Sequence, residues 1–333
     1  MIVLNENELD IAVEEIKKGN IVIFPTETVY GIGANQGNDE AVKKIFESKG
    51  RPMNNPLIVH LDNVNKIEKY AVISNDIERK LINTFMPGPF TIILKKKDIV
   101  SNLVTCNLDT VGIRIPSNEI ANKFLEKVNV GIAAPSANLS SKPSGTNVND
   151  IISDFDNKID YIIDGGHSSV GLESTVVKVI DNIPTILRPG YITKEDIESI
   201  GLPCNISSGV LNKVKDNEKV ESPGILYKHY APSSKCILLY SNNKEALIDL
   251  VKDNIIDNSI IIGSDKLKDI PCKKFINYGN TNEEIAHNIF SILRSVDKYN
   301  PSLVLIEGVE KKGLGLAIMN RLLRSVSFNY IEK

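Results

Sequence analysis

Hydroxyl, carboxylate and cationic groups gather in two segments of the first 60 residues, where they could bind an anionic ligand. Thr26, Glu27 and Thr28 follow the first apolar strand, and Lys49 and Arg51 follow a short amphipathic helix. A guanidinium binds two phosphate oxygens at once, whereas an ammonium acts as a point charge. Lys49 and Arg51 therefore indicate a phosphate site, although the same residue types are common at the solvated end of a helix.

Two further polar side chains interrupt apolar strands. Arg114 lies within VGIRIP, and His60 lies within PLIVH. Because an unpaired charge inside a strand is costly, Arg114 needs an anionic partner. A structural partner such as Asp109 or Glu173 is one possibility, and the carboxylate of a small substrate is the other. His60 by itself is typical of a core histidine whose ring nitrogens are satisfied.

A serine-rich segment and a second arginine extend the set of phosphate-binding candidates. The stretch APSANLSSKPSGT lies between an apolar strand and a predicted helix, and loop amides next to a helix N-terminus favour anions. The same stretch also has the composition of an ordinary loop. Asn55 can add a neutral hydrogen bond, and Arg188 ends a strand just before Pro189 and Gly190. The polar residues of the stretch are Ser136, Asn138, Ser140, Ser141, Ser144 and Thr146.

Several familiar nucleotide and metal motifs do not occur in the sequence. It contains no Walker A loop and no GxGxxG, and GLGLAI at Gly313 is better explained as a tight turn into a helix. It also contains no HExxH pair and no CxxC pair, which predicts free thiols and no zinc site built by the protein. The four cysteines are Cys106, Cys204, Cys236 and Cys272.

The elements that must position these residues are short apolar strands mixed with amphipathic helices. Strict βαβ alternation is missing from the first two hundred residues, which predicts a mixed, twisted sheet with flanking helices. The last hundred residues predict a smaller, open α/β domain of the Rossmann type. Strands are expected at 21–24, 57–61, 91–94, 111–115, 131–134, 161–164, 175–180, 185–188, 237–240, 259–263, 274–277 and 303–306. Helices are expected at 6–18, 39–48, 119–127, 245–252, 281–296 and 316–325, with another beginning at 74.

Local signals predict how several of these elements begin and end. The polar loop after the first strand is expected to run through Gly31 and Gly33, because glycine commonly marks a loop. Asp39 is expected to cap the helix that follows it. Thr193 and Asp196 are spaced as in a capping box and predict a short helix after them.

The chain of 333 residues, with 42% apolar and 24% charged residues, has the length and composition of two globular domains. We predict a catalytic domain at 1–200, a linker at 201–234 and a second domain at 235–333. The linker segment SPGILYKHYAP is predicted to act as a lid, because rings in a tether gain stability only by folding onto a domain. It combines aromatic and basic residues, namely Tyr227, Lys228, His229 and Tyr230.

Charge and hydropathy argue against two classes of protein. The net charge of −3 gives no overall attraction to nucleic acid. No apolar run approaches the roughly 18 residues of a membrane span. The first residues, MIVLNENELD, lack a basic segment followed by an apolar one. We therefore expect a cytoplasmic protein that is neither a membrane protein nor a dedicated nucleic-acid binder.

Several of these motifs together resemble one known family. PTETVYGIG, KGRP, NNPLIVH, GIRIP and APSAN resemble, in order and spacing, the YrdC-domain family of threonylcarbamoyl-adenylate synthases. SPGILYKHYAP and the residues after it resemble the long, two-domain form. The resemblance implies a YrdC-like fold at the N-terminus. It also implies synthesis of threonylcarbamoyl-AMP and pyrophosphate from L-threonine, bicarbonate and ATP, for threonylcarbamoyladenosine in ANN-decoding tRNAs.

The resemblance further implies a role for individual residues. Lys49 and Arg51 would act in catalysis by offsetting phosphate charge, together with the Mg²⁺ that accompanies ATP as substrate. No protein-bound metal is implied, and tRNA would be reached indirectly through a downstream transferase complex. The implied ATP-binding residues are Arg51, Asn55, Thr110, Ser136, Asn138, Ser144, Arg188 and Tyr227. The implied threonine-binding residues are Thr28, His60, Arg114, Ala134 and Ser174.

Two other functions remain open at this point. An RNA-binding module would account for a role with tRNA, but the net acidity and the lack of aromatic-basic platforms argue against it. A carbamoyl-adenylate-forming maturation enzyme, of the hydrogenase type, shares the domain. That group carries additional domains with paired cysteines, which this sequence lacks.

Overall fold

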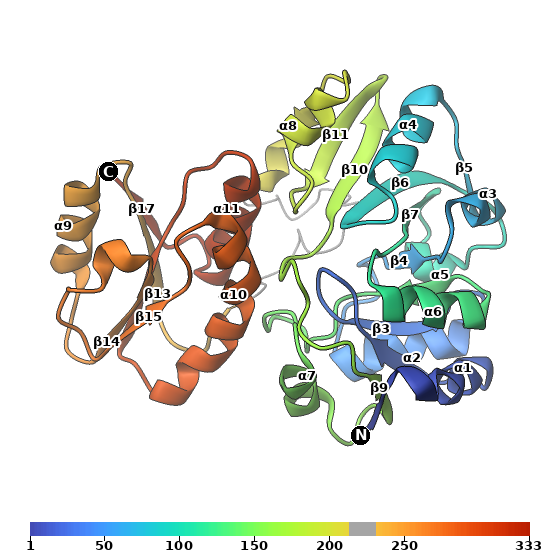
Figure 1. The fold of residues 1–333 in the computed structure, drawn as a ribbon, viewed down its shortest axis with the longest axis horizontal. Helices are drawn as coiled ribbons and strands as arrows, with labels where there is room; N and C mark the ends of the chain where they lie inside the picture. Colours follow the sequence, from blue (N-terminus) through green and yellow to red (C-terminus); the bar gives the residue numbers. More distant parts are fainter. Residues whose placement is uncertain (213–230) are drawn as a thin grey trace. The chain divides into compact units, whose positions relative to one another are not determined.

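A computed structural model describes residues 1–212 and 231–333, and its contacts divide the chain into two compact units. The first unit holds most of residues 1–212, and the second holds all of residues 231–333 together with 141–143 and 170–172. Both are built from mixed helices and strands (Figure 1). The predicted linker at 201–234 includes residues 213–230, which lie outside the described residues. The lid role of SPGILYKHYAP therefore stays a prediction.

The first unit is built around one mixed sheet, as the sequence predicts. Within residues 1–212 twelve strands join in the order β1-β9-β2-β3-β8-β4-β7-β6-β10-β11-β12, with β5 on β6. Parallel pairs such as β4 with β7 stand beside antiparallel pairs such as β7 with β6. The strands are β1 (Ile2–Leu4), β2 (Val22–Phe24), β3 (Gly31–Asn35), β4 (Ile58–His60), β5 (Ala71–Val72), β6 (Phe90–Lys96), β7 (Thr110–Arg114), β8 (Ile132–Ala134), β9 (Tyr161–Ile163), β10 (Thr175–Ile180), β11 (Ile183–Arg188) and β12 (Asn205–Ile206).

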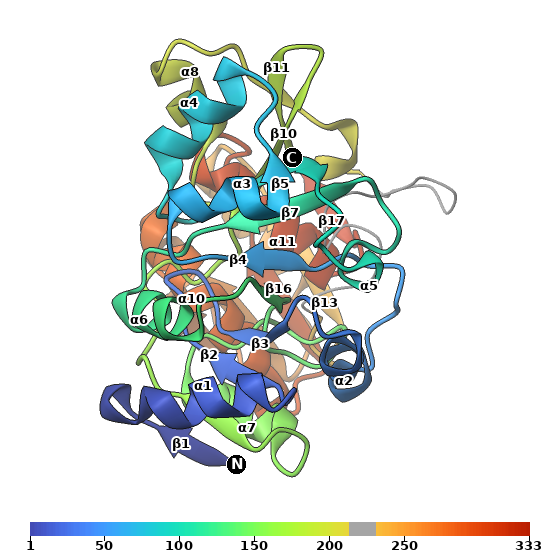
Figure 2. The same cartoon turned by 90° about the vertical axis from the view of Figure 1, so that its right-hand side faces the viewer.

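Helices cover both faces of this sheet, because its strands bury side chains on each side. The helices are α1 (Leu9–Lys17), α2 (Asp39–Lys49), α3 (Ile67–Tyr70), α4 (Asp76–Phe85), α5 (Asn102–Thr105), α6 (Glu119–Val128), α7 (Val148–Phe155) and α8 (Lys194–Ser199). Helices α1 and α6 pack on Val22, Phe24 and Ile132, whereas α2 packs on the side that carries Ile23 and Val59. Figure 2 shows α1 beside β2 and β3.

The first polar loop is shorter than the sequence predicts. Gly31 and Gly33 were expected in a loop, but they lie in β3, which runs antiparallel to β2. Their role is close packing: a Cβ on Gly33 would lie 2.7 Å from Ile132 Cγ2 and 3.0 Å from the Phe24 ring. A glycine inside a strand thus allows a neighbouring side chain to approach the backbone.

Helix caps agree with the sequence in one case and differ in others. Thr193 and Asp196 form the predicted capping box. Asp39 is the first residue of α2, and the cap is Asn38, whose side chain accepts a hydrogen bond from the Ala41 amide. The helix expected at 6–18 is a 3₁₀ turn at 6–8 followed by α1. Regular structure also continues past residue 200, since β12 pairs with β11.

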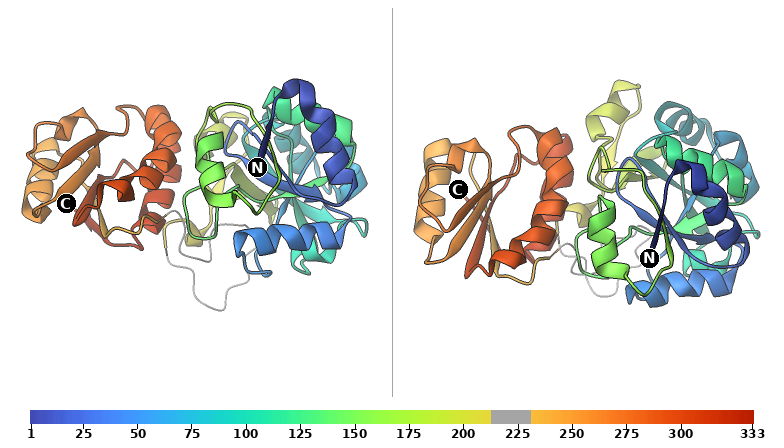
Figure 3. Two further views of the ribbon diagram at one scale, coloured as in Figure 1. Left: turned by 90° about the horizontal axis from the view of Figure 1, so that it is seen from below. Right: turned by 60° about the horizontal axis from the view of Figure 1, so that its bottom comes forward.

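The second unit is an open, parallel α/β fold, as predicted. Within residues 231–333 five strands join in the order β15-β14-β16-β13-β17, and all pairs are parallel. Its elements are β13 (Cys236–Tyr240), α9 (Lys244–Asn254), β14 (Ser259–Gly263), β15 (Lys274–Asn277), α10 (Asn282–Ser295), β16 (Leu303–Glu307), α11 (Leu314–Ser325) and β17 (Tyr330–Glu332). Figure 3 shows this sheet between α9 on one side and α10 with α11 on the other. Gly313, with φ of +52°, forms the predicted tight turn into α11.

The four cysteines are free thiols. Over the described ranges, no helix is both long and apolar enough to cross a bilayer.

Candidate functional site

A row of polar side chains crosses the sheet of the first unit. His60 on β4 is paired with Arg114 on β7, and Arg114 is paired with Thr91 on β6. The row continues through Val176 on β10 to Arg188 on β11. Because paired residues project from the same face, the backbone register alone gathers these groups, which are far apart in the sequence, on one side of the sheet. Three predicted site residues therefore share one face.

Arg114 is held in a buried ion pair. Its Nη2 lies 2.7 Å from Glu27 Oε1, and the two side chains are only 5% and 8% exposed. Glu27 Oε2 accepts a hydrogen bond from the Ser117 amide at 3.1 Å. Arg114 Nη2 also lies 3.4 Å from Thr26 Oγ1. The Nε of Arg114 is buried, and no hydrogen-bond partner for it exists among the described residues.

The partner of Arg114 differs from the structural partners proposed from the sequence. Asp109 and Glu173 were the examples of a structural partner. The structure supplies Glu27 instead, because the turn after β2 places it beside the last residue of β7. A substrate carboxylate at Arg114 stays a separate prediction, because the guanidinium has more donors than Glu27 uses.

His60 is neutral over the physiological pH range. Burial, and then the Arg114 cation, lower the pKa of its imidazole from 6.5 to about 3. Nδ1 lies 3.1 Å from the Ile58 carbonyl oxygen, which can only accept a hydrogen bond. The ring meets Phe24 edge to face, with centroids 5.6 Å apart. His60 thus offers a fixed, uncharged ring next to a cation.

Two hydroxyl pairs border the same row. Ser174 Oγ lies 2.8 Å from Thr91 Oγ1, and Thr28 Oγ1 lies 2.9 Å from Thr26 Oγ1. Arg188 donates from Nε and Nη2 to the Ser174 carbonyl oxygen at 3.1 and 2.9 Å. Ser174 is therefore positioned by both its backbone and its side chain.

These contacts show where the predicted threonine-binding residues lie. Thr28 and Ser174 are linked by hydroxyl pairs to Thr26 and Thr91, which themselves approach or pair with Arg114. Ala134 on β8 is paired with Ile58, two residues from His60 on the same face of β4. The structure thus gathers all five predicted residues around one part of the sheet. Their roles in binding remain predictions.

The serine-rich segment starts with a tightly bonded loop. The Ser136 hydroxyl lies 2.6 Å from Asn138 Oδ1, and Asn138 Nδ2 donates to the Leu139 carbonyl at 2.9 Å. Lys49 Nζ lies 2.5 Å from both the Ser136 and the Asn138 carbonyl oxygens. Further along, the Ser144 hydroxyl donates to Glu173 Oε1 at 2.6 Å. The predicted ATP-binding residues of this segment therefore sit in a loop with fixed geometry.

Arg51 lies in the loop between α2 and β4. Its Nε donates to the Asn55 carbonyl oxygen at 3.3 Å, and its Nη2 donates to that of Pro56 at 3.2 Å. The Arg51 side chain is partly exposed, whereas Asn55 is buried. Arg51 thus shapes its own loop while keeping contact with solvent.

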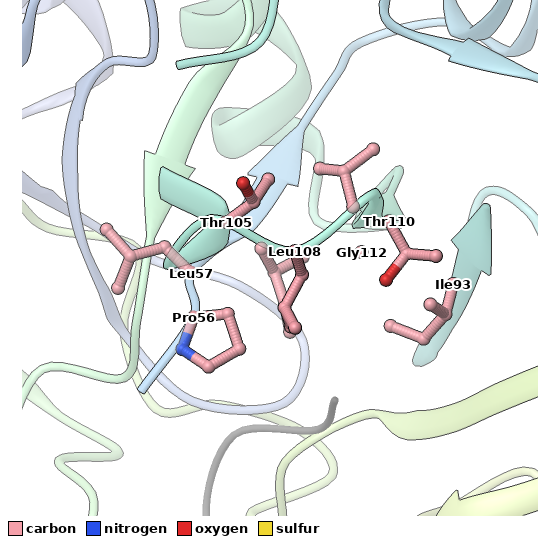
Figure 4. Close-up of a pocket in the computed structure, with 9 residues that line it drawn as sticks. Pro56, Leu57, Ile93, Thr105, Leu108, Thr110 and Gly112 are labelled. Carbon is pink, nitrogen blue, oxygen red and sulfur yellow. The ribbon is translucent and has the colours of Figure 1, made fainter. Parts of the chain in front are cut away.

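A small hollow lies next to that loop (Figure 4). It is lined by Pro56, Leu57, Ile58, Ile93, Thr105, Leu108, Thr110, Val111 and Gly112. Its floor is the paired row of Ile58, Gly112 and Ile93, which is two residues along the strands from the row of His60 and Arg114. Two residues of a strand span about 7 Å. The polar row and the mainly apolar hollow are therefore neighbours on the same face.

Gly112 keeps this hollow open. A Cβ at that position would lie 3.3 Å from both Ile58 Cγ1 and Ile93 Cδ1, and 3.4 Å from Thr91 Cγ2. Thr110, a predicted ATP contact, begins β7 at the rim. Tyr227, the remaining predicted ATP contact, lies outside the described residues.

Sequence reasoning missed three residues that organise the site. Glu27 was noted as a carboxylate in the first motif but was not assigned to Arg114. Thr91 gave no signal, because a threonine in a strand is ordinary. Asp154 on α7 is buried at 5% exposure and accepts a hydrogen bond from the Leu139 amide at 3.3 Å. No bounds were predicted for that helix, so Asp154 carried no signal in the sequence.

In the described parts of the chain, no three His, Cys, Asp or Glu side chains are arranged to hold a metal ion. The charged groups that the site offers are guanidinium, ammonium and isolated carboxylates. Such a set is suited to binding an anion and positioning it.

Comparisons with known proteins cover both units. A family model described as Telomere recombination, of the Sua5/YciO/YrdC type, matches residues 14–190. A second model, described as Threonylcarbamoyl-AMP synthase, C-terminal domain, matches residues 192–327. The chain is 41% identical to the threonylcarbamoyl-AMP synthase of Pyrococcus abyssi over 336 residues, covering 99% of this chain and 97% of the relative.

Two further comparisons agree. The threonylcarbamoyl-AMP synthase of Bacillus subtilis is 37% identical over 340 residues, covering 98% of this chain and 95% of the relative. The crystal structure of P. abyssi Sua5 complexed with L-threonine matches with a TM-score of 0.92 at 40% identity, covering 100% of each chain. The similarity thus extends from one end of the chain to the other.

Proposed function

The chain belongs to the threonylcarbamoyl-AMP synthase family, as its motifs suggested, and on that premise we propose that it converts L-threonine, bicarbonate and ATP into threonylcarbamoyl-AMP. Its arrangement supports this activity. The polar row around Arg114 and the hollow beside Thr110 lie next to each other on one face of the sheet. This adjacency is the observation on which the proposal rests, because the reaction must join an amino acid to a nucleotide.

Threonine binds at the polar row in this proposal. The Arg114 guanidinium receives the substrate carboxylate, with Glu27 holding it in place. Neutral His60, Thr28 and Ser174 orient the remaining polar groups of the amino acid. The solved P. abyssi structure was obtained with L-threonine, which is consistent with an amino-acid site in this fold.

ATP binds beside the polar row in this proposal. Arg51 and Arg188 meet phosphate oxygens, since a guanidinium offers paired donors. Thr110, which lines the hollow, and Asn55, which precedes its lining residue Pro56, contact the nucleotide from the edge of the sheet; the hollow itself is the size of a water molecule. Ser136, Asn138 and Ser144 contact the nucleotide from the serine-rich loop, and Tyr227 is included by family resemblance. Mg²⁺ enters with ATP as part of the substrate.

The chemistry is a condensation followed by adenylate transfer. The threonine amine attacks bicarbonate to form a carbamate with loss of water. A carbamate oxygen then attacks the α-phosphorus in line, and pyrophosphate leaves. No covalent enzyme intermediate is needed. Positioning the two reactants and offsetting the phosphate charge therefore supply most of the catalysis.

The product carries an activated acyl phosphate, which must be passed to an acceptor. We propose that a downstream transferase complex delivers the threonylcarbamoyl group to tRNA. The net charge of −3 agrees with an indirect role, because a direct RNA contact would require a local basic patch.

Product identification tests the proposal. The protein is incubated with threonine, ¹³C-bicarbonate and ATP, and mass spectrometry is used to seek threonylcarbamoyl-AMP carrying the heavy carbon. Pyrophosphate should appear in equal amount. Reactions that lack threonine or bicarbonate are the controls. Release of pyrophosphate without the labelled adenylate, or no product at all, would reject the proposed activity.

A further inference from the structure

The ammonium of Lys49 is buried, and its donors face a single loop. Lys49 is the last residue of α2 and is only 3% exposed. Its Nζ lies 2.5 Å from the Ser136 carbonyl oxygen, 2.5 Å from that of Asn138, and 3.5 Å from Asn138 Oδ1. An ammonium has three N–H groups. Two short contacts and one longer one thus join Nζ to oxygens of residues 136–138.

The same loop is held from two other directions. The Ser140 amide donates to the Lys49 carbonyl oxygen at 3.0 Å, which ties the loop to the end of α2. The Leu139 amide donates to Asp154 Oδ2 at 3.3 Å, and Asp154 is buried on α7. Lys49 therefore binds the carbonyl side of the loop, while Asp154 binds an amide at its other end.

Two carboxylates counter only part of the effect of burial on Lys49. Burial and the nearby Arg51 lower the pKa of Lys49 well below its usual value, whereas Asp154 and Glu173 act in the opposite direction. A buried ammonium is tolerable only where oxygen acceptors and carboxylates surround it. The loop carbonyls supply those acceptors, and Asp154 and Glu173 add a smaller coulombic contribution.

We propose that Lys49 and Asp154 are positioning residues that clamp the loop 136–140 in the geometry required to receive the nucleotide. The inference rests on the proposed function, since it assigns the loop to ATP. It assigns Lys49 a role through loop oxygens, in place of the phosphate contact implied by family resemblance. It also gives a role to Asp154, which the site prediction did not include.

If Lys49 and Asp154 clamp the loop, both must contribute to nucleotide binding through it. Loss of either anchor leaves buried polar groups unsatisfied and lets the loop move. Ser136 and Asn138 would then bind the nucleotide less well, although neither anchor touches it. The affinity for threonine would change little, because the proposed threonine-binding residues lie on the strands and on other loops. Removing the second anchor after the first should cost little more, because the loop is already released.

The test measures binding of α,β-methylene ATP, which cannot release pyrophosphate, together with threonine binding. The variants are Lys49→Met, Asp154→Ala, Asp154→Asn and the double variant Lys49→Met/Asp154→Ala. Lys43→Met, on the exposed side of α2, and Asp156→Ala, with a 56% exposed side chain, are the matched controls. Binding is measured below the melting temperature of each variant.

We expect Lys49→Met and Asp154→Ala each to weaken binding of the nucleotide analogue about tenfold, as when a buried hydrogen-bond partner is removed. The double variant should be no more than about threefold worse than either single one. Asp154→Asn, which keeps an acceptor for the Leu139 amide, should bind nearly as well as the wild type. A stability role alone would lower the melting temperature without this pattern of ATP-specific loss and rescue.

The proposal is overturned if Asp154→Ala binds the analogue like the wild type while Lys49→Met does not, because Lys49 would then contact the nucleotide itself. Additive losses in the double variant would also overturn it. If Lys49→Met does not fold, the comparison of Asp154→Ala with Asp154→Asn decides alone. Failure of the synthase activity is recognised separately, since the wild type would then make no adenylate in the product experiment.

Discussion

Glu27 Oε1 and Arg114 Nη2 are 2.7 Å apart and almost fully buried, although 87 residues separate them in the chain. The turn after β2 and the end of β7 meet at this contact. The Glu27 carboxylate uses only some of the N–H donors of the Arg114 guanidinium. Arg114 Nε is buried and has no hydrogen-bond partner among the described residues. The ion pair therefore holds the Arg114 guanidinium in place and leaves some of its N–H donors for another acceptor. Such an arrangement suits the binding of a second carboxylate.

Arg114→Ala should lose both stability and threonine affinity. Removing one member of a buried pair leaves the other uncompensated and typically costs about 3 to 5 kcal/mol. Threonine binding should fall more than binding of the ATP analogue. Urea unfolding and calorimetric titration measure the two effects, with exposed Arg79→Ala as control. Adding Glu27→Ala to Arg114→Ala should restore part of the stability but none of the threonine affinity. Unchanged threonine affinity in a destabilised variant would make Arg114 purely structural.

Arg51→Ala should impair turnover while the fold is kept. Arg51 is partly exposed, and its Nε and Nη2 donate to the Asn55 and Pro56 carbonyl oxygens of its own loop, so little core packing is lost. Loss of one preorganised charge-stabilising donor typically lowers turnover about 10²-fold. Pyrophosphate release at saturating and limiting ATP measures the effect, beside a melting curve. Turnover within about threefold of the wild type would remove Arg51 from the phosphate site.

Gly112→Ala should weaken the binding of ATP more than that of threonine. The added methyl group would stand 3.3 Å from Ile58 and Ile93 at the floor of the hollow, and one of them would have to shift. We expect a higher KM for ATP with nearly unchanged threonine affinity. Gly37→Ala, where a Cβ would meet only Asn35 Oδ1 at 3.6 Å, is the matched control. Equal effects on both substrates would show that the change distorts the sheet rather than the nucleotide side.

His60 should make folding stability depend on pH in a defined window. The pKa of His60 is lowered in the folded protein from 6.5 to about 3. Between these values the unfolded chain binds more protons, so this contribution is present above pH 6.5 and is lost as pH falls toward 3. The slope is at most about 1.4 kcal/mol for each pH unit.

The His60 contribution is isolated by comparison with His60→Gln. Urea unfolding is followed at several pH values for both proteins, and the difference between their stabilities is plotted. Carboxylates elsewhere affect both proteins equally and cancel. A difference that does not change between pH 6.5 and pH 4 would show that His60 gains a proton in the folded state as readily as in the unfolded one.

Local sequence predicted most strands and helices and much of the site, because the signals involved act over a few residues. Alternating apolar residues in VGIRIP indicated β7, and the Thr193 and Asp196 spacing indicated a capping box that formed. The need of Arg114 for an anion also followed from its place in an apolar strand. Family motifs added the synthase assignment and the set of residues to examine.

Only the tertiary structure decided which groups meet. Glu27 became the partner of Arg114 through strand pairing across the sheet, and the strands gave no local signal of that register. Lys49 has the sequence context of an exposed cation at a helix end, yet it is buried against loop 136–138, 87 residues or more away. Hydrogen-bond partners distant in sequence depend on the packing of whole elements. Charge and propensity are properties of single residues, and they do not contain that information.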